Sequence, residues 1–378
     1  MKYAIFGCGN KGKKILKELG KDKVVCFIDN DKKKQGDYYN EIPIINLESY
    51  IKLYKDNELI MPVSEFYYDI KKQLQNSGID KWIIFKEKGN EGVEDTLIVN
   101  PYKNCNRISY EKNESKGNRV LINDYAKQLY KFPSLFEGIE IETYNRCNGN
   151  CSFCPVSVKN DTREFKKMSP ELFKKIIDEL GNINYMGKLS LFSNNEPFLD
   201  NRIIDFQRYA REKLPNAHLY LYTNGTLLTL DKFNQVIDYL DELIIDNYNQ
   251  ELNLIPNVKK IVDICNDNRE LKKKVTVYLR KPYEILTSRG GDAPNKAYNL
   301  ENYGMDSCVL PFKQMIVRPD GKVSLCCNDP LGRYSLGDLN VQTIEEIWYG
   351  EEYQNIRNKI LKGRENITKC GKCDVFLV

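Results

Sequence analysis

Short apolar runs alternate with amphipathic segments over the first 90 residues of the chain. The runs have the length of buried strands, and residues 13–19, which follow the first run, have a helical period. The predicted strands are residues 3–6, 24–28, 58–61 and 82–85. Because strands that alternate with helices form parallel sheets, we predict a Rossmann-like α/β domain over residues 1–95.

The alternation resumes after a less regular stretch. Residues 96–135 combine Asn100-Pro101 with a polar run at 111–118, and we predict a linker there. Over residues 136–300, amphipathic helices such as 171–180 separate five predicted strands: 139–143, 188–192, 218–222, 243–246 and 275–279. Five or six β/α units predict a partial (β/α)6 barrel.

The last segment, residues 301–378, has a different pattern. Runs at 312–318 and 322–325 flank Pro319-Asp320-Gly321, which is typical of a hairpin turn. Thr343 and Glu346 have the spacing of a capping box and predict a helix from about residue 344. The predicted fold class is therefore α/β, with a parallel N-terminal sheet, a central partial barrel and a small hairpin-plus-helix domain.

Composition and charge narrow the classes of protein. Hydrophobic residues make up 41% of the 378 residues and charged residues 29%, which is typical of a folded soluble protein. The net charge is only +4 and no concentrated basic patch is seen, so we predict no nucleic-acid partner. No apolar run approaches the roughly 20 residues that span a bilayer. The chain begins directly with a strand pattern instead of a signal peptide, so we expect a cytoplasmic protein with no membrane partner.

The cysteine content is unusual. The chain has 12 cysteines and one histidine, His218, so any metal site must be built almost wholly from thiolates. In a cytoplasmic chain, such sites favour iron–sulfur clusters or zinc over disulfides. Cys8, Cys26, Cys105 and Cys265 fit no ligand spacing and are expected to be ordinary residues.

Three cysteines form the sharpest motif of the chain. Cys147, Cys151 and Cys154 have the spacing C-x-x-x-C-x-x-C in the loop after the first predicted barrel strand. A four-iron cluster needs four ligands, so three thiolates leave one iron open to a non-protein ligand. A structural zinc site would be closed by a fourth Cys or His, and none lies nearby in the sequence.

This motif resembles the signature of the radical S-adenosylmethionine (SAM) superfamily. The resemblance implies that the open iron binds SAM, and that the reduced cluster cleaves SAM to give a 5′-deoxyadenosyl radical that removes a substrate hydrogen. It also implies an electron donor such as flavodoxin or ferredoxin, and it places Phe153 beside the adenine.

Two further motifs follow the next two predicted strands, where barrel sites are built. Asn195-Glu196-Pro197 is similar to the family's Gly-Glu-Pro motif, which holds the methionyl amino group, with Asn195 in place of the glycine. Thr223-Asn224 begins a Thr-Asn-Gly sequence that is also found in the family.

A second cysteine set lies near the C-terminus. Cys308 and Cys326 flank the hairpin, and Cys370 and Cys373 form a C-x-x-C. The segment resembles the SPASM/Twitch extension of the same superfamily, and the number of cysteines is closer to the Twitch form with one auxiliary [4Fe–4S] cluster. A four-thiolate zinc site is the alternative.

The N-terminal domain carries a glycine-rich turn. Gly7, Gly9 and Gly12 follow a strand and open a helix, where backbone amides favour a phosphate, and Asp29 ends the next strand, where an acid binds a ribose hydroxyl. The segment resembles nucleotide-sugar-binding domains of surface-glycan enzymes, which implies a nucleotide or nucleotide sugar. A Rossmann-like domain with no ligand is the alternative.

The remaining catalytic candidate is Arg289, in a Ser-Arg-Gly-Gly-Asp segment similar to the pocket-lining segments of SPASM/Twitch proteins. Our main hypothesis is an oxidoreductase of the dehydrogenase type that acts on a small polar molecule such as a sugar, nucleotide sugar or cyclitol. The alternatives are a peptide-modifying enzyme, a sugar epimerase or dehydratase, and a cysteine-rich redox sensor or zinc protein.

Overall fold

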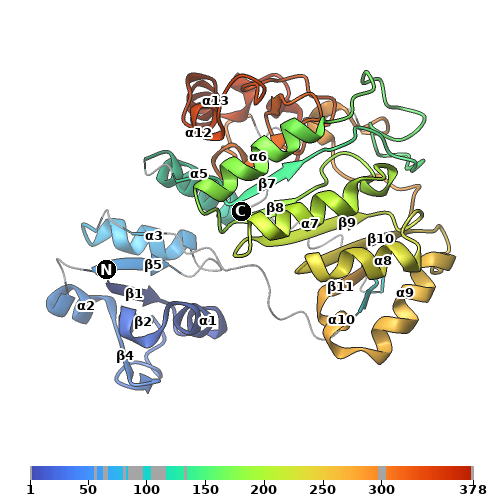
Figure 1. Ribbon diagram of the computed structural model, residues 1–378. Helices are drawn as coiled ribbons and strands as arrows, with labels where there is room; N and C mark the ends of the chain where they lie inside the picture. The colour runs from blue at the N-terminus through green and yellow to red at the C-terminus, as the bar shows by residue number, and fades with distance from the viewer. Residues whose placement is uncertain are drawn as a thin grey trace. The chain divides into compact units, whose positions relative to one another are not determined.

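The computed structural model describes residues 2–54, 58–62, 67–79, 82–83, 97–103, 116–131, 134–296 and 304–375 (Figure 1). The chain divides into two compact units. The first comprises residues 1–92, 110–128 and 378, and the second comprises residues 93–109 and 129–377.

The first unit contains a five-stranded sheet with the order β3-β4-β2-β1-β5. Its strands are β1 (Lys2–Phe6), β2 (Val24–Ile28), β3 (Tyr38–Tyr39), β4 (Ile42–Ile45) and β5 (Glu58–Pro62), and its helices include α1 (Asn10–Leu19), α2 (Leu47–Tyr54) and α3 (Tyr67–Asn76). All pairs are parallel except β3 with β4. The order β4-β2-β1-β5 is that of the first four strands of a doubly wound sheet. Trp82 forms a single bridge with Ile60, and the rest of the strand predicted at 82–85 lies largely outside the described residues.

Both faces of this sheet are apolar, as the predicted α/β class requires. Ile5 and Phe27 belong to one buried cluster, which α1 covers through Ile15. Phe6 and Ile28 belong to the other cluster, which includes Ile70 of α3. Successive residues of β1 and β2 therefore enter different cores, because side chains alternate across a strand.

The second unit is built on an eight-stranded sheet with the order β13-β12-β7-β8-β9-β10-β11-β6. The five strands predicted from the sequence are β7 (Gly138–Ile141), β8 (Lys188–Ser190), β9 (His218–Thr223), β10 (Glu242–Tyr248) and β11 (Val275–Arg280). They are parallel neighbours in chain order. The connecting helices are α6 (Pro170–Asn182), α7 (Ile203–Lys213), α8 (Leu230–Val236), α9 (Pro256–Asp267) and α10 (Arg269–Lys274). Helices α6 to α9 pack in sequence, each against the next, as expected for the outer layer of a partial barrel (Figure 1).

The segment predicted as a linker differs from that expectation. It contains β6 (Ile98–Val99), which pairs in parallel with β11, and helix α5 (Lys116–Lys131). A two-residue strand leaves too short a pattern to detect from sequence, because its partner lies far along the chain.

The C-terminal hairpin continues the barrel sheet. β12 (Gln314–Val317) pairs in parallel with β7 and antiparallel with β13 (Val323–Ser324). The strand predicted from residue 312 begins two residues later, because Pro311 opens the short helix α11 (Leu310–Lys313). Helices α12 (Ile344–Trp348) and α13 (Glu351–Lys362) follow, and the capping box of Thr343 and Glu346 is confirmed.

Candidate active site

The three-cysteine motif forms a compact loop after β7. Cys151 is buried, and Cys147 and Cys154 are partly exposed. A β-carbon at Gly149 would lie 3.3 Å from Cys147 Sγ and 3.9 Å from Cys151 Sγ, so both thiols border the position of this glycine and a side chain there would crowd Cys147. Burial raises the pKa of Cys147 and of Cys151 to about 12. Thiols of this kind stay protonated until a metal replaces the proton, and the donor set therefore fits an iron–sulfur cluster.

Glu196 joins this loop to the two strands that follow. Its backbone N–H donates to the carbonyl of Arg146, next to Cys147, at 2.9 Å. Its buried carboxylate accepts hydrogen bonds from the Thr223 hydroxyl and the Asn224 N–H, both at 2.8 Å. It also accepts from the Phe198 N–H at 3.1 Å, as the N-cap of the turn that Pro197 opens. Burial raises the pKa of Glu196 to about 7.

The two motifs found in the sequence therefore meet at one carboxylate. Asn224 continues the connection, because its side-chain amide donates to Asn148 Oδ1 at 2.8 Å and lies 4.0 Å from Cys147 Sγ. The structure thus brings Glu196, Thr223 and Asn224 next to the three-cysteine loop. With three donors already bound, Glu196 holds the Thr-Asn-Gly turn in addition to any contact with a ligand.

Asn195 and Phe153 complete this end of the barrel. Asn195 is buried; its Oδ1 accepts from the Ser193 N–H at 3.1 Å, and its Nδ2 has no partner within the described part of the chain. An unpaired buried donor costs stability unless a ligand accepts from it. The ring of Phe153 lies 6.2 Å from that of Tyr248, at the end of β10.

The four C-terminal cysteines also converge. Burial raises the pKa of Cys326, and the thiols of Cys327, Cys370, Cys308 and Cys373 raise it further. Four neighbouring, partly buried thiols have the chemistry of a donor set for a closed cluster.

The barrel strands also present a polar inner face. Along β7 and β9, the alternate residues Ile139, Leu219 and Leu221 are fully buried, whereas Glu140 and Tyr220 between them are only partly buried. Because side chains alternate across a strand, the apolar face packs under the helices and the polar face lines the interior. This inner face is the one that offers contacts to a polar molecule.

Glu140 is the functional candidate that the sequence analysis missed. It is aligned across the sheet with Ser190, which is aligned with Tyr220. Gln314 Nε2 donates to Glu140 Oε1 at 2.7 Å, and desolvation raises the pKa of Glu140 to about 7. Ser190 Oγ is buried and has no partner among the described residues. The available signal was a glutamate at an inward position of an otherwise apolar strand.

Arg289 approaches the same region from the loop after β11. Its guanidinium donates to Asn194 Oδ1, and its positive charge lowers the pKa of Glu140 against the effect of burial. Asn194 is itself fixed: its N–H donates to Glu142 at 2.6 Å, and its side-chain amide donates to the carbonyl of Cys327 at 3.3 Å. Asn194 therefore connects the Asn-Glu-Pro turn, Arg289 and the auxiliary cysteine segment.

The glycine-rich turn lies in the other unit. A β-carbon at Gly12 would lie 1.9 Å from the carbonyl oxygen of Gly7, so the close approach of helix to strand requires glycine. At Gly9 a β-carbon would meet nothing within 4 Å. Asp29 accepts from the Cys8 N–H at 2.7 Å and from the Asp31 N–H at 2.9 Å, so its carboxylate already stabilises the turn.

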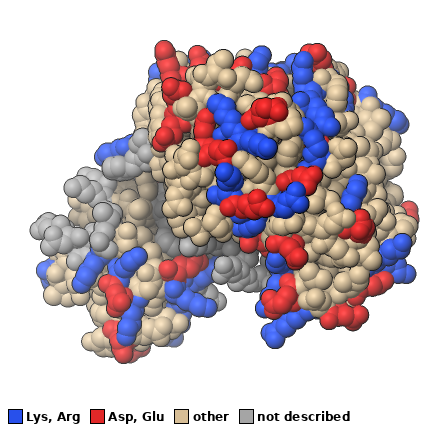
Figure 2. All heavy atoms as spheres, viewed as in Figure 1, with Lys and Arg blue, Asp and Glu red and all other residues tan. Residues whose placement is uncertain are grey.

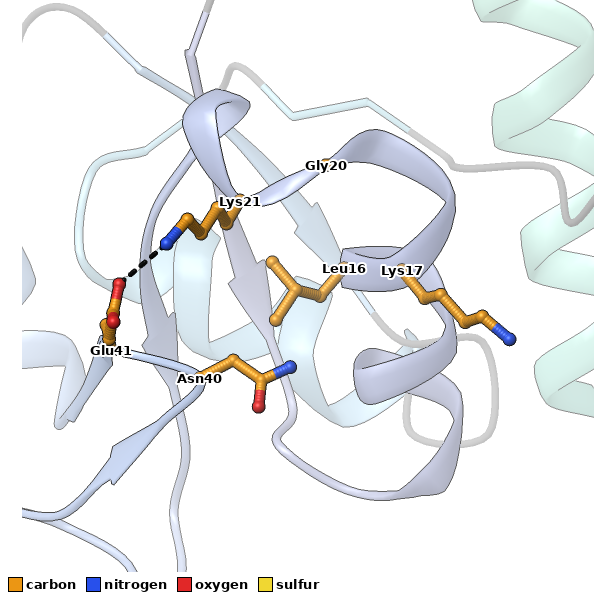
Figure 3. A pocket seen from close by; sticks show the side chains of 6 residues that line it. All are labelled: Leu16, Lys17, Gly20, Lys21, Asn40 and Glu41. Atoms are coloured by element: carbon orange, nitrogen blue, oxygen red, sulfur yellow. Dashed lines mark hydrogen bonds and ion pairs between the residues drawn. The ribbon is translucent and has the colours of Figure 1, made fainter.

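A shallow pocket in this unit lies elsewhere. It encloses about 390 Å³ at the C-terminal end of α1 (Figure 3). Its lining residues are Leu16, Lys17, Gly20, Lys21, Asn40 and Glu41. The C-terminal end of a helix does not favour an anion, so this pocket is not the predicted phosphate site. A nucleotide at Gly7, Gly9, Gly12 and Asp29 stays a prediction.

Family models match all three regions. The model described as radical SAM superfamily matches residues 141–280, and the SPASM model, an iron–sulfur cluster-binding domain, matches residues 308–374. The chain contains a radical SAM domain followed by a SPASM domain. A third model, described as C2185-like, N-terminal, matches residues 1–85.

Known proteins with radical SAM domains are similar over most of this region. The S-adenosyl-L-methionine-dependent 2-deoxy-scyllo-inosamine dehydrogenase of Niallia circulans is 26% identical over 64% of this chain and 93% of its own length. The crystal structure of BtrN in complex with AdoMet and 2-DOIA superposes with a TM-score of 0.54 at 25% identity, over 65% of this chain and 95% of that chain. The radical SAM cyclopropyl synthase TigE of Paramaledivibacter caminithermalis is 22% identical to this chain. The aligned region covers 68% of this chain and 46% of TigE.

These matches confirm the superfamily, the enzyme class and the cofactors expected from the sequence. The protein is an iron–sulfur, SAM-dependent oxidoreductase that acts on a small-molecule substrate. Its radical SAM domain holds a catalytic [4Fe–4S] cluster with SAM, and its SPASM domain holds an auxiliary [4Fe–4S] cluster. The individual ligand and substrate residues remain predictions.

Proposed function

We propose that this radical SAM enzyme oxidises a secondary alcohol of a small polyhydroxylated ring, a cyclitol or a sugar, to a ketone. The observation that carries the proposal is the polar group set on the inner face of the barrel. The positive charge of Arg289 acts on Glu140 there, and Asn194 accepts from Arg289 and donates to the carbonyl of Cys327, next to Cys326.

The comparisons support the same class of substrate. The relative that matches over 93% of its length is a dehydrogenase of an inosamine, which is a ring with several hydroxyl groups. A carboxylate with a guanidinium nearby is suited to bind neighbouring hydroxyl groups, because one accepts and the other donates hydrogen bonds.

We propose that Cys147, Cys151 and Cys154 ligate the catalytic cluster, and that the auxiliary cluster is ligated by Cys308, Cys326, Cys370 and Cys373. When bound, the catalytic cluster and SAM supply a radical that removes a hydrogen atom from carbon, and the auxiliary cluster supplies an acceptor for one electron.

Two protein side chains would handle the proton and the oxygen of the alcohol. Oxidation of the alcohol removes one hydrogen atom, one electron and one proton, and Glu140 is suited to accept the hydroxyl proton because burial raises its pKa to about 7. Arg289 is placed to donate hydrogen bonds to the oxygen that becomes the carbonyl.

We further propose that flavodoxin or ferredoxin supplies the reducing electron, and that the protein works in the cytoplasm without a nucleic-acid or membrane partner. The cysteines within the described residues are all free thiols, as a reducing compartment favours. None of the described helices is long and apolar enough to cross a membrane. Acidic and basic side chains are interspersed over the face shown in Figure 2.

The test is anaerobic reconstitution followed by iron counting and incubation with SAM, dithionite and a ring-deuterated cyclitol. We expect about eight irons per chain, deuterium in 5′-deoxyadenosine and a ketone product. An epimer with solvent deuterium at carbon would instead support the epimerase alternative. Cleavage of SAM with no deuterium transfer from any cyclitol or sugar tested would refute the proposed substrate class.

A further inference from the structure

The loop that carries Arg289 has a strained backbone. Arg289, Gly290 and Gly291 have φ values of 50°, 62° and 89°, so three consecutive residues occupy the left-handed region. Glycine adopts this region freely, but a residue with a side chain such as Arg289 does not. Arg289 keeps this backbone conformation only because surrounding contacts stabilise it. The contacts that hold this loop therefore decide where the Arg289 guanidinium points.

One end of the loop is held by the residue after Cys373. Ser288 is fully buried, and its N–H donates to Asp374 Oδ1 at 2.8 Å. The Ser288 hydroxyl donates to the carbonyl of Lys372 at 2.7 Å. Asp374 is fixed in turn by an ion pair of 2.6 Å with Lys296.

The other end of the loop is held by the residue before Cys370. The buried Lys369 ammonium forms an ion pair with Asp292 and donates to the carbonyl of Arg289 at 3.4 Å. It also lies 3.7 Å from the fully buried carboxylate of Asp329. The Lys369 side chain leaves no space at Gly290, where a β-carbon would lie 2.8 Å from its Cγ.

The two holding residues thus flank the C-x-x-C of the auxiliary site directly. We propose that this segment is a clamp, defined as Lys369 to Asp374, which sets the conformation of the Arg289 loop and thereby makes substrate binding depend on the loaded auxiliary cluster. Lys369 and Asp374 are positioning residues in this proposal, which rests on the proposed function for the role of Arg289. The auxiliary cluster then has a structural effect on the substrate site in addition to accepting an electron.

The chain offers a matched control. Lys372 lies in the same segment between the same cysteines, but its side chain is exposed and only its carbonyl is used. The substitution Lys369→Met removes the buried ammonium, Lys372→Met removes an exposed one, and Asp374→Ala removes the acceptor of Ser288. Asp374→Ala serves as the second variant if Lys369→Met fails to fold, since Lys369→Met removes the cation beside the buried Asp329 carboxylate and leaves Asp292 paired with Arg333 alone.

The experiment measures hydrogen–deuterium exchange of residues 286–293 in reconstituted full-length protein, together with iron content, SAM cleavage without substrate, and KM for 2-deoxy-scyllo-inosamine. A lost hydrogen bond to a charged group predicts about tenfold to a hundredfold faster exchange in this loop and a KM raised by about tenfold or more, with iron content unchanged. The double variant Cys370→Ala/Cys373→Ala is expected to show the same faster exchange.

Exchange in Lys369→Met and Asp374→Ala that matches the Lys372→Met control would overturn the clamp. The readouts also separate the clamp from the proposed function. If the wild-type enzyme cleaves SAM but does not oxidise the inosamine, the substrate proposal fails, and the exchange data still decide whether the clamp exists.

Discussion

Replacing Glu140 with glutamine tests the central chemical step. The change keeps the shape of the side chain and an oxygen that accepts from Gln314, now 2.7 Å away, but removes the base. A general base contributes about 10²- to 10⁴-fold to a rate, so kcat for ketone formation should fall by that factor with a small change in KM. SAM cleavage without substrate should be unchanged, because Glu140 is not among the residues around Cys147.

The raised pKa of Glu140 also predicts the direction in which the oxidation rate changes with pH. The pKa of Glu140 is raised to about 7 by burial, so the carboxylate form is about one tenth of the total at pH 6 and about nine tenths at pH 8. Oxidation by the wild-type enzyme should therefore fall as pH drops through about 7, and the Glu140→Gln variant should lack this limb. The charged and titratable groups near Glu140 are Arg289, Glu142, Tyr220, Tyr222 and Cys327, and hydrogen bonds from the Ser193 and Gln314 side chains lower its pKa against burial. Burial raises the pKa of the two tyrosines and of the Cys327 thiol, which keeps them neutral in this range.

Two comparisons make the result decisive. Glu137→Gln is the matched control, because Glu137 lies just before the same strand with a more exposed carboxylate, 3.7 Å from Lys313. The pKa of Glu196 is also raised to about 7, so the pH profile of SAM cleavage alone must be measured and divided out. A Glu140→Gln variant that retains kcat within about threefold, or that keeps the same acid limb, would refute the role of Glu140 as base.

Further predictions concern each part of the chain. Cys154→Ala should abolish SAM cleavage and lower the iron content from about eight to about four per chain, as measured by iron assay; an unchanged iron count would exclude Cys154 as a ligand. Thr223→Val removes a 2.8 Å hydrogen bond that favours the charged form of Glu196, so the pKa of Glu196 should rise. The fall in the rate of SAM cleavage at low pH should then begin at a higher pH. An unchanged pH dependence would show that the ionisation of Glu196 does not control this step. Gly12→Ala should destabilise the N-terminal unit by about 1–3 kcal/mol in thermal unfolding, because its β-carbon would lie 1.9 Å from the Gly7 oxygen, while SAM cleavage stays unchanged; an unaltered melting curve would contradict this packing.

The strands of the barrel could be predicted from sequence because each has apolar residues at its buried positions, although β8 spans only Lys188–Ser190. β9 and β11 lie within one residue of their predicted ends. β6 could not be predicted, since two residues form no pattern and only its pairing with β11 makes it a strand. The strand prediction was wrong at residues 312 and 313, because Pro311 opens a helical turn before the strand begins.

Some residues of the candidate site could likewise be predicted from sequence and others could not. Cys147, Glu196 and Thr223 could be found because they stand at fixed offsets in short motifs, and a motif is a local property of the chain. Glu140 and Asn194 have no such offsets, and what marks them is their partners: Gln314, Arg289 and Cys327 come from segments 95 to 174 residues away. The residues proposed to hold the cofactor stand in local motifs, whereas the residues proposed to contact the substrate are brought together by the sheet from distant parts of the chain. The substrate of this enzyme must therefore be sought by testing the group around Glu140 and Arg289.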